Sequence, residues 1–367
     1  MKNKLGAVLL LLACAASAQQ WQQALPGYQF QFPRDYFNHP DYRTEWWYYT
    51  GNLRAADGHR YGFELTFFRQ GIPLPPQARS SEDAVWLPDQ VYLAHLALSD
   101  IDGGSFYHTE RLNRAGPGLS GASLEQQRYW NGNWEVRWNS LSAGTQHLEA
   151  VCDRFTLKID LTPQKQAVIN GRNGVSQKGP LPGAGSHYIS FTRLRASGAL
   201  KMNGSPIAVN GVAWMDHEYF SEPLDRDLAG WDWFAIQLDN NEELMLYQLR
   251  TKSGEKSLYS SGTFVDAAGK SHFLDVSQFS LTPGAVWRSA RSGARYPISW
   301  KISIPSLQIE LSEQTALQDQ ELYSGNGITP TYWEGAVSYA GQVQRRAVRG
   351  VGYLEMTGYG GPLRFGE

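Results

Sequence analysis

The chain has 367 residues, of which 19% are charged, and its formal net charge at pH 7 is −2. A nucleic-acid-binding protein normally carries a clustered basic excess, so this balance argues against nucleic acid as a partner. Aromatic residues make up 13% of the chain, together with 37 glycines and 18 prolines. Many aromatics, frequent turn formers and few charges are typical of an all-β protein, and they exclude a disordered chain, a coiled coil and a collagen. The length predicts roughly two domains.

Residues 1–18 have the pattern of an export signal. Lys2 and Lys4 form a basic start, an apolar run follows at 5–13, and small residues at 16–18 form a cleavage site. The pattern predicts a periplasmic or secreted protein. Leu-Leu-Ala-Cys at 11–14 resembles a bacterial lipoprotein box, so anchoring in a membrane through a lipid on Cys14 is the alternative. No later apolar run is long enough to span a membrane.

Period-2 alternation of apolar and polar residues dominates the rest of the chain and predicts half-buried strands. In chain order these are 63–67, 134–138, 157–161 and 300–304. Turn signals lie between the strands. They are Asp57-Gly58, Asp102-Gly103-Gly104, Asn131-Gly132, Asn170-Gly171, Asn210-Gly211 and Ala268-Gly269. The best helix candidate is 312–323.

Three pairs of similar segments occur in the same order in both halves of the chain. Residues 211–216 match 350–355, 158–163 resemble 301–305, and the stretch opening at Trp47 resembles the one opening at Trp231. Such repetition predicts two tandem β-barrels. We place the N-terminal domain at 28–222 and the C-terminal domain at 223–367, with an insertion around the Pro-rich segment 73–88.

Several catalytic motifs are absent or incomplete. His217-Glu218 begins like a zinc-protease helix, but Ser221 stands where the second His is required. No Gly-x-Ser-x-Gly elbow occurs, and the eight His are scattered without metal-like pairs. Cys152 is the only cysteine outside the signal and is interpreted as a small buried hydrophobe. The prediction is a protein without metal or cofactor.

Two polar-aromatic clusters remain as candidate sites. In the first, strand alternation places Glu45, Trp47 and Tyr49 on one face. It forms either a barrel floor or a cavity wall. In the second, alternation places His217 on the face opposite Asp216, together with Met215 and Tyr219. A desolvated His on a core face stays neutral unless a carboxylate pairs with it.

At these clusters the sequence resembles the AttH and carotenoid 1,2-hydratase (hydroxyneurosporene synthase) family of lipocalin-like predicted secreted hydrolases. The resemblance covers essentially the whole mature chain. It is carried by residues 45–51 (Glu-Trp-Trp-Tyr-Tyr-Thr-Gly), 63–69, Ala94-His95, 214–218 (Trp-Met-Asp-His-Glu) and 231–233 (Trp-Asp-Trp). It implies two lipocalin-like antiparallel β-barrel domains and addition of water to a C=C bond of an acyclic carotenoid without a cofactor.

The family's acid–base site resembles an Asp-His pair followed by an aromatic, with a Tyr and an Asp on a nearby strand. Asp216, His217 and Tyr219 match the first part and Tyr247 matches the later Tyr, but Leu249 stands where the later carboxylate is expected.

Two functional hypotheses follow. The first is an exported hydratase-like or cyclising enzyme acting on a lipophilic unsaturated small molecule; the second is a carrier for a lipid-like ligand without turnover. Association with a membrane transporter is a weaker expectation. The candidate catalytic residues are His217, Asp216 and Tyr247. The candidate ligand-binding residues are Glu45, Trp47, Tyr49, His95, Trp214, Tyr219, Trp231 and Trp233.

Overall fold

The computed structural model describes residues 21–73, 87–202, 204–222, 225–325 and 329–361. These residues form antiparallel β-sheets, with only short 3-10 turns at η1 (Arg34–Tyr36) and η3 (Pro305–Leu307) and no α-helix in the described ranges. Within those ranges no helix has the length and apolarity needed to cross a membrane. The predicted all-β class is confirmed. The predicted signal, Cys14 and residues 74–86 of the Pro-rich segment lie outside the described residues.

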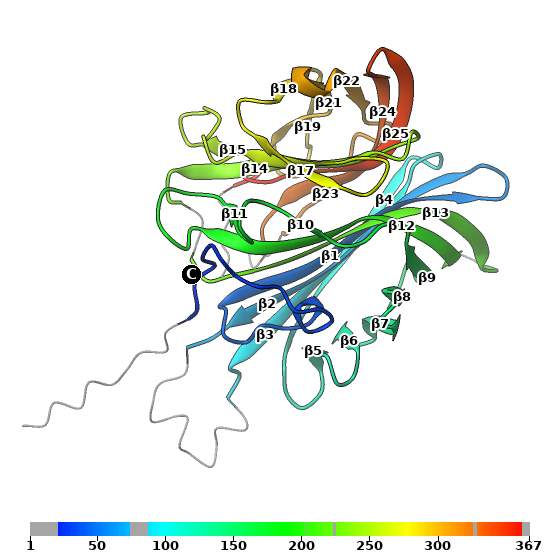
Figure 1. Ribbon diagram of the computed structural model, residues 1–367. Helices are drawn as coiled ribbons and strands as arrows, with labels where there is room; N and C mark the ends of the chain where they lie inside the picture. Colours follow the sequence, from blue (N-terminus) through cyan, green and yellow to red (C-terminus); the bar gives the residue numbers. More distant parts are fainter. Residues whose placement is uncertain (1–20, 74–86, 203, 223–224, 326–328, 362–367) are drawn as a thin grey trace, which may run out of the picture.

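The first sheet curls into a nearly closed barrel (Figure 1). Asn131 helps to bring its two ends together, because its Nδ2 donates to the Tyr92 carbonyl at 3.0 Å. Two short strands, β10 (Val168–Ile169) and β11 (Ser176–Gln177), pair with β12. The order of strands across the sheet is β4 (Ser105–Arg114), β3 (Gln90–Asp100), β2 (Arg60–Gly71), β1 (Thr44–Ala55), β13 (Ile207–Phe220), β12 (Gly185–Lys201), β9 (Thr156–Pro163), β8 (Thr145–Val151), β7 (Trp134–Ser140), β6 (Arg128–Asn131) and β5 (Ser120–Ser123).

The second sheet is a half-barrel that lies against the first (Figure 1). A separate ribbon is formed by β19 (Val286–Arg288) and β20 (Arg295–Pro297), and β23 (Glu321–Leu322) pairs with β24. The order of strands across the sheet is β17 (Ser271–Asp275), β16 (Ser261–Val265), β15 (Glu243–Thr251), β14 (Leu228–Leu238), β25 (Arg346–Met356), β24 (Tyr332–Val343), β22 (Ile309–Gln314), β21 (Ser299–Ile304) and β18 (Ser280–Pro283). The structure thus agrees with two lipocalin-like barrel units.

Two of the three predicted repeats occupy equivalent places. Residues 211–216 lie on β13, which pairs with β1, and 350–355 lie on β25, which pairs with β14. In both sheets the last strand therefore runs beside the first. The third pair is shifted, because 158–163 lie on β9, two strands from β13, whereas 301–304 lie on β21, three strands from β25. The counterpart of β9 is β22, so this part of the predicted repeat was wrong.

Two further local predictions were wrong. The helix expected at 312–323 is instead the end of β22 and all of β23. In β22 the buried residues Ile309, Leu311 and Glu313 alternate with exposed ones, as in a strand with one face covered, and the strand pairs with β21 and β24. Gly211 lies inside β13 rather than in a turn. A glycine is needed there because a Cβ would be 1.9 Å from the Asn52 carbonyl oxygen.

The strands at the junction of the sheets are buried on both faces. On β2, for example, Phe63 and Phe67 face the core of the first barrel, yet Glu64 and Thr66 between them are also buried. By contrast, β9 keeps its alternation of buried and exposed residues, because only one of its faces is covered. The second sheet covers the outer face of β1, β2, β12 and β13.

Hydrogen bonds join the two units across this junction. Gln237 Nε2 on β14 donates to the carbonyls of Thr192 at 2.8 Å and Ala213 at 2.9 Å. Asn52 Nδ2 on β1 donates to the Gly352 carbonyl at 3.0 Å. These bonds fix the two sheets relative to each other, and the candidate site lies between them.

Candidate functional site

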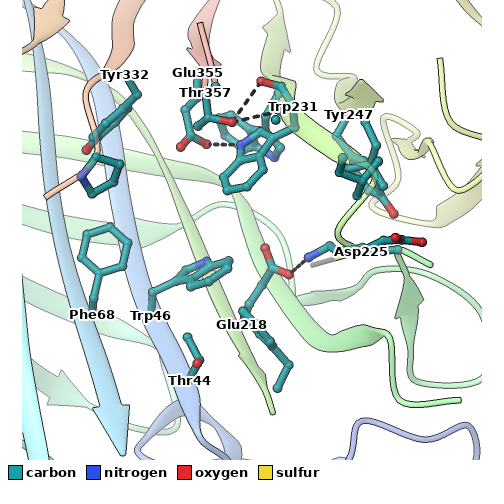
Figure 2. Close-up of a pocket in the computed structure, with 18 of the residues that line it drawn as sticks. Thr44, Trp46, Phe68, Glu218, Asp225, Trp231, Tyr247, Tyr332, Glu355 and Thr357 are labelled. Atoms are coloured by element: carbon teal, nitrogen blue, oxygen red, sulfur yellow. Dashed lines mark hydrogen bonds and ion pairs between the residues drawn. The ribbon is translucent and has the colours of Figure 1, made fainter. Parts of the chain in front are cut away.

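A cavity of about 970 Å³ lies between the two sheets (Figure 2). Aromatic side chains from both units line it, and charged groups lie among them. From the first sheet the lining residues include Trp46, Tyr48, Thr66, Phe68, Tyr188, Asp216, Glu218 and Phe220; from the second they include Trp231, Trp233, Tyr247, Leu249, Tyr332, Glu355, Thr357 and Tyr359. Its size and mixed lining suit a small, largely apolar molecule.

Asp216, on β13, is, like Glu218, an acidic residue of the first sheet that is buried at this cavity. Its Oδ1 accepts hydrogen bonds from Ser190 Oγ at 2.5 Å and Trp214 Nε1 at 2.7 Å, and its Oδ2 accepts one from the Tyr188 hydroxyl. Burial raises the pKa of Asp216 to about 7, although these hydrogen bonds oppose the shift. Asp216 therefore holds a proton for much of the time at neutral pH.

Glu355, on β25, is the corresponding acidic group of the second sheet. Its Oε2 accepts a hydrogen bond from Trp231 Nε1 at 2.9 Å, as Figure 2 shows. Burial raises the pKa of Glu355 to about 8, and the nearby charges of Glu64, Glu218 and Asp216 act in the same direction. The two sheets thus each contribute a carboxyl group that is protonated near neutral pH.

Further acidic groups are buried behind the cavity wall. Glu64 accepts a hydrogen bond from Thr66 at 2.7 Å, and burial raises its pKa to about 7. Glu334 accepts one from the Tyr48 hydroxyl at 2.6 Å, and burial raises its pKa well above the usual value. One carboxyl oxygen of each residue, Oε2, has no hydrogen-bond partner among the described residues. In the described part of the chain, the junction between the sheets thus contains buried carboxyl groups that are hydrogen-bonded to these hydroxyl groups rather than to positively charged side chains.

His95 lies at the edge of this region. Its Nδ1 is 2.6 Å from the hydroxyl of Tyr332, which lines the cavity. Burial lowers the pKa of His95 to about 4, so the ring is neutral. The Tyr332 hydroxyl donates its one proton to Glu64 Oε1 at 3.3 Å, so the neutral His95 ring donates from Nδ1 to the Tyr332 oxygen.

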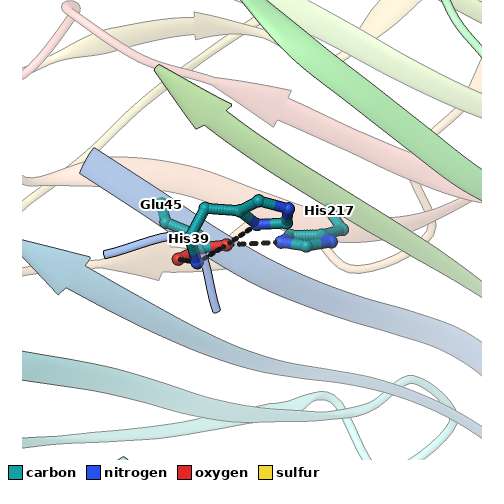
Figure 3. Close-up of side chains that lie close together, drawn as sticks. All are labelled: His39, Glu45 and His217. Carbon is teal, nitrogen blue, oxygen red and sulfur yellow. Dashed lines mark hydrogen bonds and ion pairs between the residues drawn. The ribbon is translucent and has the colours of Figure 1, made fainter. Parts of the chain in front are cut away.

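The opposite face of β1 and β13 carries a different group, enclosed in the first barrel (Figure 3). Glu45 Oε1 lies 2.8 Å from both His39 Nδ1 and His217 Nε2, and Glu45 Oε2 accepts a hydrogen bond from Arg69 Nε at 2.8 Å. Burial would raise the pKa of Glu45, but the charges of Arg69 and His39 and the hydrogen bonds of both His hold it well below its usual range. Glu45 is therefore ionised.

The pKa values of the two His of this group are shifted in opposite directions. Burial opposes protonation of His39, but the Glu45 charge and a hydrogen bond to Asp35 raise its pKa. Burial lowers the pKa of His217 despite its bond to Glu45, and its Nδ1 has no partner among the described residues. His217 is thus a neutral ring that donates from Nε2 to a carboxylate.

His39, Glu45 and His217 also bring three potential metal ligands together, with their ligand atoms within 4.8 Å of one another. In this arrangement both rings hydrogen-bond to the same carboxyl oxygen, and Arg69 already neutralises Glu45. A metal would have to displace both N–H groups and lie close to a guanidinium ion, so the donor set fits a metal poorly. The group fits a structural charge network better.

The structure separates the predicted site residues into three groups. Asp216, Tyr247, Trp231 and Trp233 line the cavity. Trp214 lies behind Asp216, and its ring meets Trp233 edge-on at 6.2 Å, while His95 contacts Tyr332. The remaining predicted residues lie in or beside the core of the first barrel; they are Glu45, Trp47, Tyr49, His217 and Tyr219.

The expected acid–base pair of Asp216 and His217 is not formed. The two residues are adjacent on β13, so their side chains point to opposite faces, one to the cavity and the other to Glu45. Tyr247 does reach the cavity, where Ser261 Oγ donates to its hydroxyl at 2.8 Å. Leu249 also lines it, so this position supplies no carboxylate.

Several cavity residues were not among the predicted site residues. Trp46 and Tyr48 alternate with the predicted Trp47 and Tyr49, so the signal was present but was assigned to the wrong face. The repeat aligned Glu355 with Asp216, which identifies it in retrospect. Lys178 lies in a connecting segment, where the sequence carries no signal for it.

The fold and cavity define a protein of two lipocalin-like barrels with a site between them. A model of the AttH-like family matches residues 23–359, and the chain belongs to that family. The predicted resemblance is confirmed. A crystal structure of an AttH protein from Nitrosomonas europaea is 34% identical, with a TM-score of 0.81 over 92% of this chain and 99% of that one.

Two more distant proteins are similar to the chain. The crystal structure of kievitone hydratase from Nectria haematococca is 14% identical, with a TM-score of 0.70 over 93% of this chain and 97% of that one, which shows a shared fold. Dehydratase asqC from Emericella nidulans is 19% identical over 219 residues. That match spans 58% of this chain and 61% of the dehydratase.

Proposed function

We propose that the protein is a hydratase-like enzyme that adds water to, or removes it from, a lipophilic unsaturated small molecule held between the two sheets. One observation carries this proposal: Asp216 and Glu355 face the same aromatic cavity, and burial raises their pKa values to about 7 and about 8. Carboxyl groups that keep a proton at neutral pH are the acids that this reaction needs.

The chemistry follows from the lining of the cavity. Addition of water to an isolated C=C bond begins with transfer of a proton to one carbon, which leaves a cation on the other. Asp216 is our candidate proton donor, and Glu355 is a second proton-holding group. The faces of Trp231, Trp233 and Tyr247 stabilise the positive charge. Water then attacks the cation, and its proton is released to a base.

The comparisons support the proposed reaction class. One protein of the same fold is named a hydratase, and one distant relative is named a dehydratase. Addition and removal of water are one reaction in two directions, so a single acid–base site serves both. We further propose, from the sequence alone, that the chain is exported, with processing after residue 18 or lipid attachment at Cys14. Measuring the mass of the mature N-terminus separates these two.

The test of the function begins with protein purified from its own source. Native mass spectrometry and organic extraction identify any small molecule that accompanies it, and the extract is then incubated with fresh enzyme in ¹⁸O-labelled water. We expect wild type to change the mass of the molecule by one water, with the label in any added hydroxyl. Asp216→Asn should still bind the molecule and convert it at least 100-fold more slowly.

The same experiment contains the result that contradicts the proposal. A bound molecule that wild type leaves unchanged would identify a carrier, which is the alternative that the aromatic lining also allows. Asn at 216 keeps the size of the side chain and its acceptor oxygen, so the variant removes the acidic proton and little else.

A further inference from the structure

A charged pair lies in the cavity beside Asp216. Lys178, in the segment between β11 and β12, donates from Nζ to Glu218 Oε2 and, at 3.0 Å, to Ser186 Oγ. Ser186 Oγ donates to the same Glu218 oxygen. Lys178 and Glu218 both line the cavity, and Figure 2 shows the Glu218 carboxylate pointing into it. Both belong to the first unit, so the pair does not join the two sheets.

Aromatic rings surround the ammonium group. Lys178 Nζ lies 5.5 Å from the ring centroid of Tyr188, 5.9 Å from that of Trp46, and 6.0 Å from those of Phe220 and Tyr247. Ring faces carry negative charge density that stabilises a cation. The rings and Glu218 thus surround the ammonium group of a Lys178 side chain that is only 15% exposed.

The pair still has hydrogen-bonding capacity toward the cavity. An ammonium group has three N–H donors, and Glu218 and Ser186 use two of them. Glu218 receives both of its hydrogen bonds at Oε2, and its Oε1 accepts none from the described residues. One donor and one acceptor therefore lie side by side at a wall that is otherwise largely aromatic. A hydroxyl group or a water molecule is their complement, because it both donates and accepts.

We infer that Lys178 and Glu218 form an oxygen subsite, which binds the water that is added to the ligand or the hydroxyl group that is removed from it. The role of the subsite in the reaction rests on the proposed function, whereas its ability to bind a ligand oxygen rests only on the lining of the cavity. The expected ligands are a neutral unsaturated alcohol and the alkene that forms when this alcohol loses water. A carboxylate ligand is disfavoured because Glu218 would repel it.

The position of the subsite relative to Asp216 supports this assignment. Asp216 and Glu218 are two residues apart on β13 and face the same cavity, so their backbones are about 6.6 Å apart. The space between them admits a C=C bond, with the acid near one carbon and the bound oxygen near the other.

The reaction balances without any further reagent. In hydration, Asp216 gives its proton to one carbon, the water oxygen at Lys178 bonds to the other, and a water proton passes to the Glu218 carboxylate. That proton returns to Asp216 through solvent, so the net change is one C=C bond and one water converted to an alcohol. Dehydration is the reverse.

A series of three probes on one carbon skeleton tests the subsite by binding alone: farnesene, farnesol and farnesoic acid. Quenching of tryptophan fluorescence, with native mass spectrometry as the second method, gives their affinities. We expect wild type to bind farnesol roughly 10-fold more tightly than farnesene, as expected for hydrogen bonds to charged groups, and more tightly than farnesoic acid. In Lys178→Met the preference for farnesol over farnesene should disappear, with farnesene binding unchanged.

Lys252→Met is the matched control, because Lys252 also lines the cavity but is exposed; it should keep the preference. Glu218→Gln is the second variant, and it should raise the affinity for farnesoic acid. Equal binding of farnesene and farnesol by wild type, tighter binding of farnesoic acid, or no binding of any probe would overturn the inference. Loss of conversion in Asp216→Asn without a preference for farnesol would leave the proposed function standing and the subsite rejected. A preference for farnesol in a wild-type protein that leaves the extracted molecule unchanged would place the subsite in a carrier.

Discussion

The two faces of β1 and β13 bury acidic groups in opposite electrostatic states. On the face inside the first barrel, Glu45 is ionised because Arg69 and His39 supply positive charge. On the face toward the second sheet, Asp216 is enclosed by hydroxyl and indole donors, and burial raises its pKa to about 7. The same depth of burial thus gives a fixed carboxylate in one place and a proton-holding acid in the other.

The difference shows which of the two faces is suited to chemistry. A carboxylate with its charge neutralised and its hydrogen bonds occupied resists change, so the Glu45 group is suited to holding β1, β2, β13 and the segment around His39 together. An acid without a cation partner is held at a free-energy cost, and such groups cluster at functional sites. Four predictions test this contrast.

The largest expected effect is on stability, at Arg69. Arg69→Met leaves the buried Glu45 charge with less compensation and should reduce the free energy of unfolding by about 3–5 kcal/mol. Urea unfolding measures the change. Adding Glu45→Gln should recover part of it, whereas Asp216→Asn alone should not reduce the free energy of unfolding, because it removes an acid that burial holds at a cost. A mild effect of Arg69→Met would mean that the network is not structural.

His217 comes next, because it belongs to the network although the sequence made it a catalytic candidate. His217→Ala removes a hydrogen bond to a carboxylate and leaves a cavity, so we expect a loss of about 2–3 kcal/mol in the free energy of unfolding. The folded variant should still convert the extracted molecule. A variant of unchanged stability that binds the molecule but does not convert it would restore His217 as a catalytic residue.

The third prediction concerns pH. The pKa values of Asp216 and Glu355 in the folded protein, about 7 and about 8, lie above their ordinary values of 3.8 and 4.5. The folded state therefore holds protons that the unfolded state has lost, so this contribution to stability is complete below about pH 4 and is lost as the pH rises through 7 to 8.

Comparison with the double variant Asp216→Asn, Glu355→Gln isolates these two groups. Between pH 6 and pH 7 the free energy of unfolding of wild type should fall by about 2 kcal/mol more than that of the variant. His39, whose pKa is also raised, contributes in the same direction to both proteins and cancels. Parallel pH curves would show that the two carboxyls are ionised throughout.

The smallest expected effect is at Tyr48, which joins the two sheets through Glu334. Tyr48→Phe removes a 2.6 Å hydrogen bond to a carboxyl group whose other oxygen has no partner among the described residues. We expect a loss of about 1 kcal/mol in the free energy of unfolding. Tyr323→Phe, at a residue that is 38% exposed, is the control and should have almost no effect. Equal effects would indicate that the bond contributes nothing.

Much of the fold could be predicted from local patterns. Alternation such as Leu157, Ile159 and Leu161 on one side of β9 depends only on the two-residue period of a strand, and it correctly predicted an all-β chain. The match between 211–216 and 350–355 correctly related the closing strands of the two sheets. Alternation could not determine which strands of the two sheets are equivalent, because it is the same on every strand that has one face covered. The similar segments on β9 and β21 therefore lie on strands that are not equivalent.

The sequence by itself determined which residues of β1 and β13 share a face, since neighbours on a strand point to opposite sides. It could not determine which face forms the cavity, because both faces are rich in aromatic and polar residues and both are buried. Packing of the second sheet on the first decided that Trp46, Tyr48, Asp216 and Glu218 line the cavity. The tertiary structure also placed His39, Arg69 and His217 around Glu45 and brought Lys178 to Glu218. Apart from the contact of His39 with Glu45, those contacts join residues at least 24 positions apart in the chain, and no local pattern encodes them.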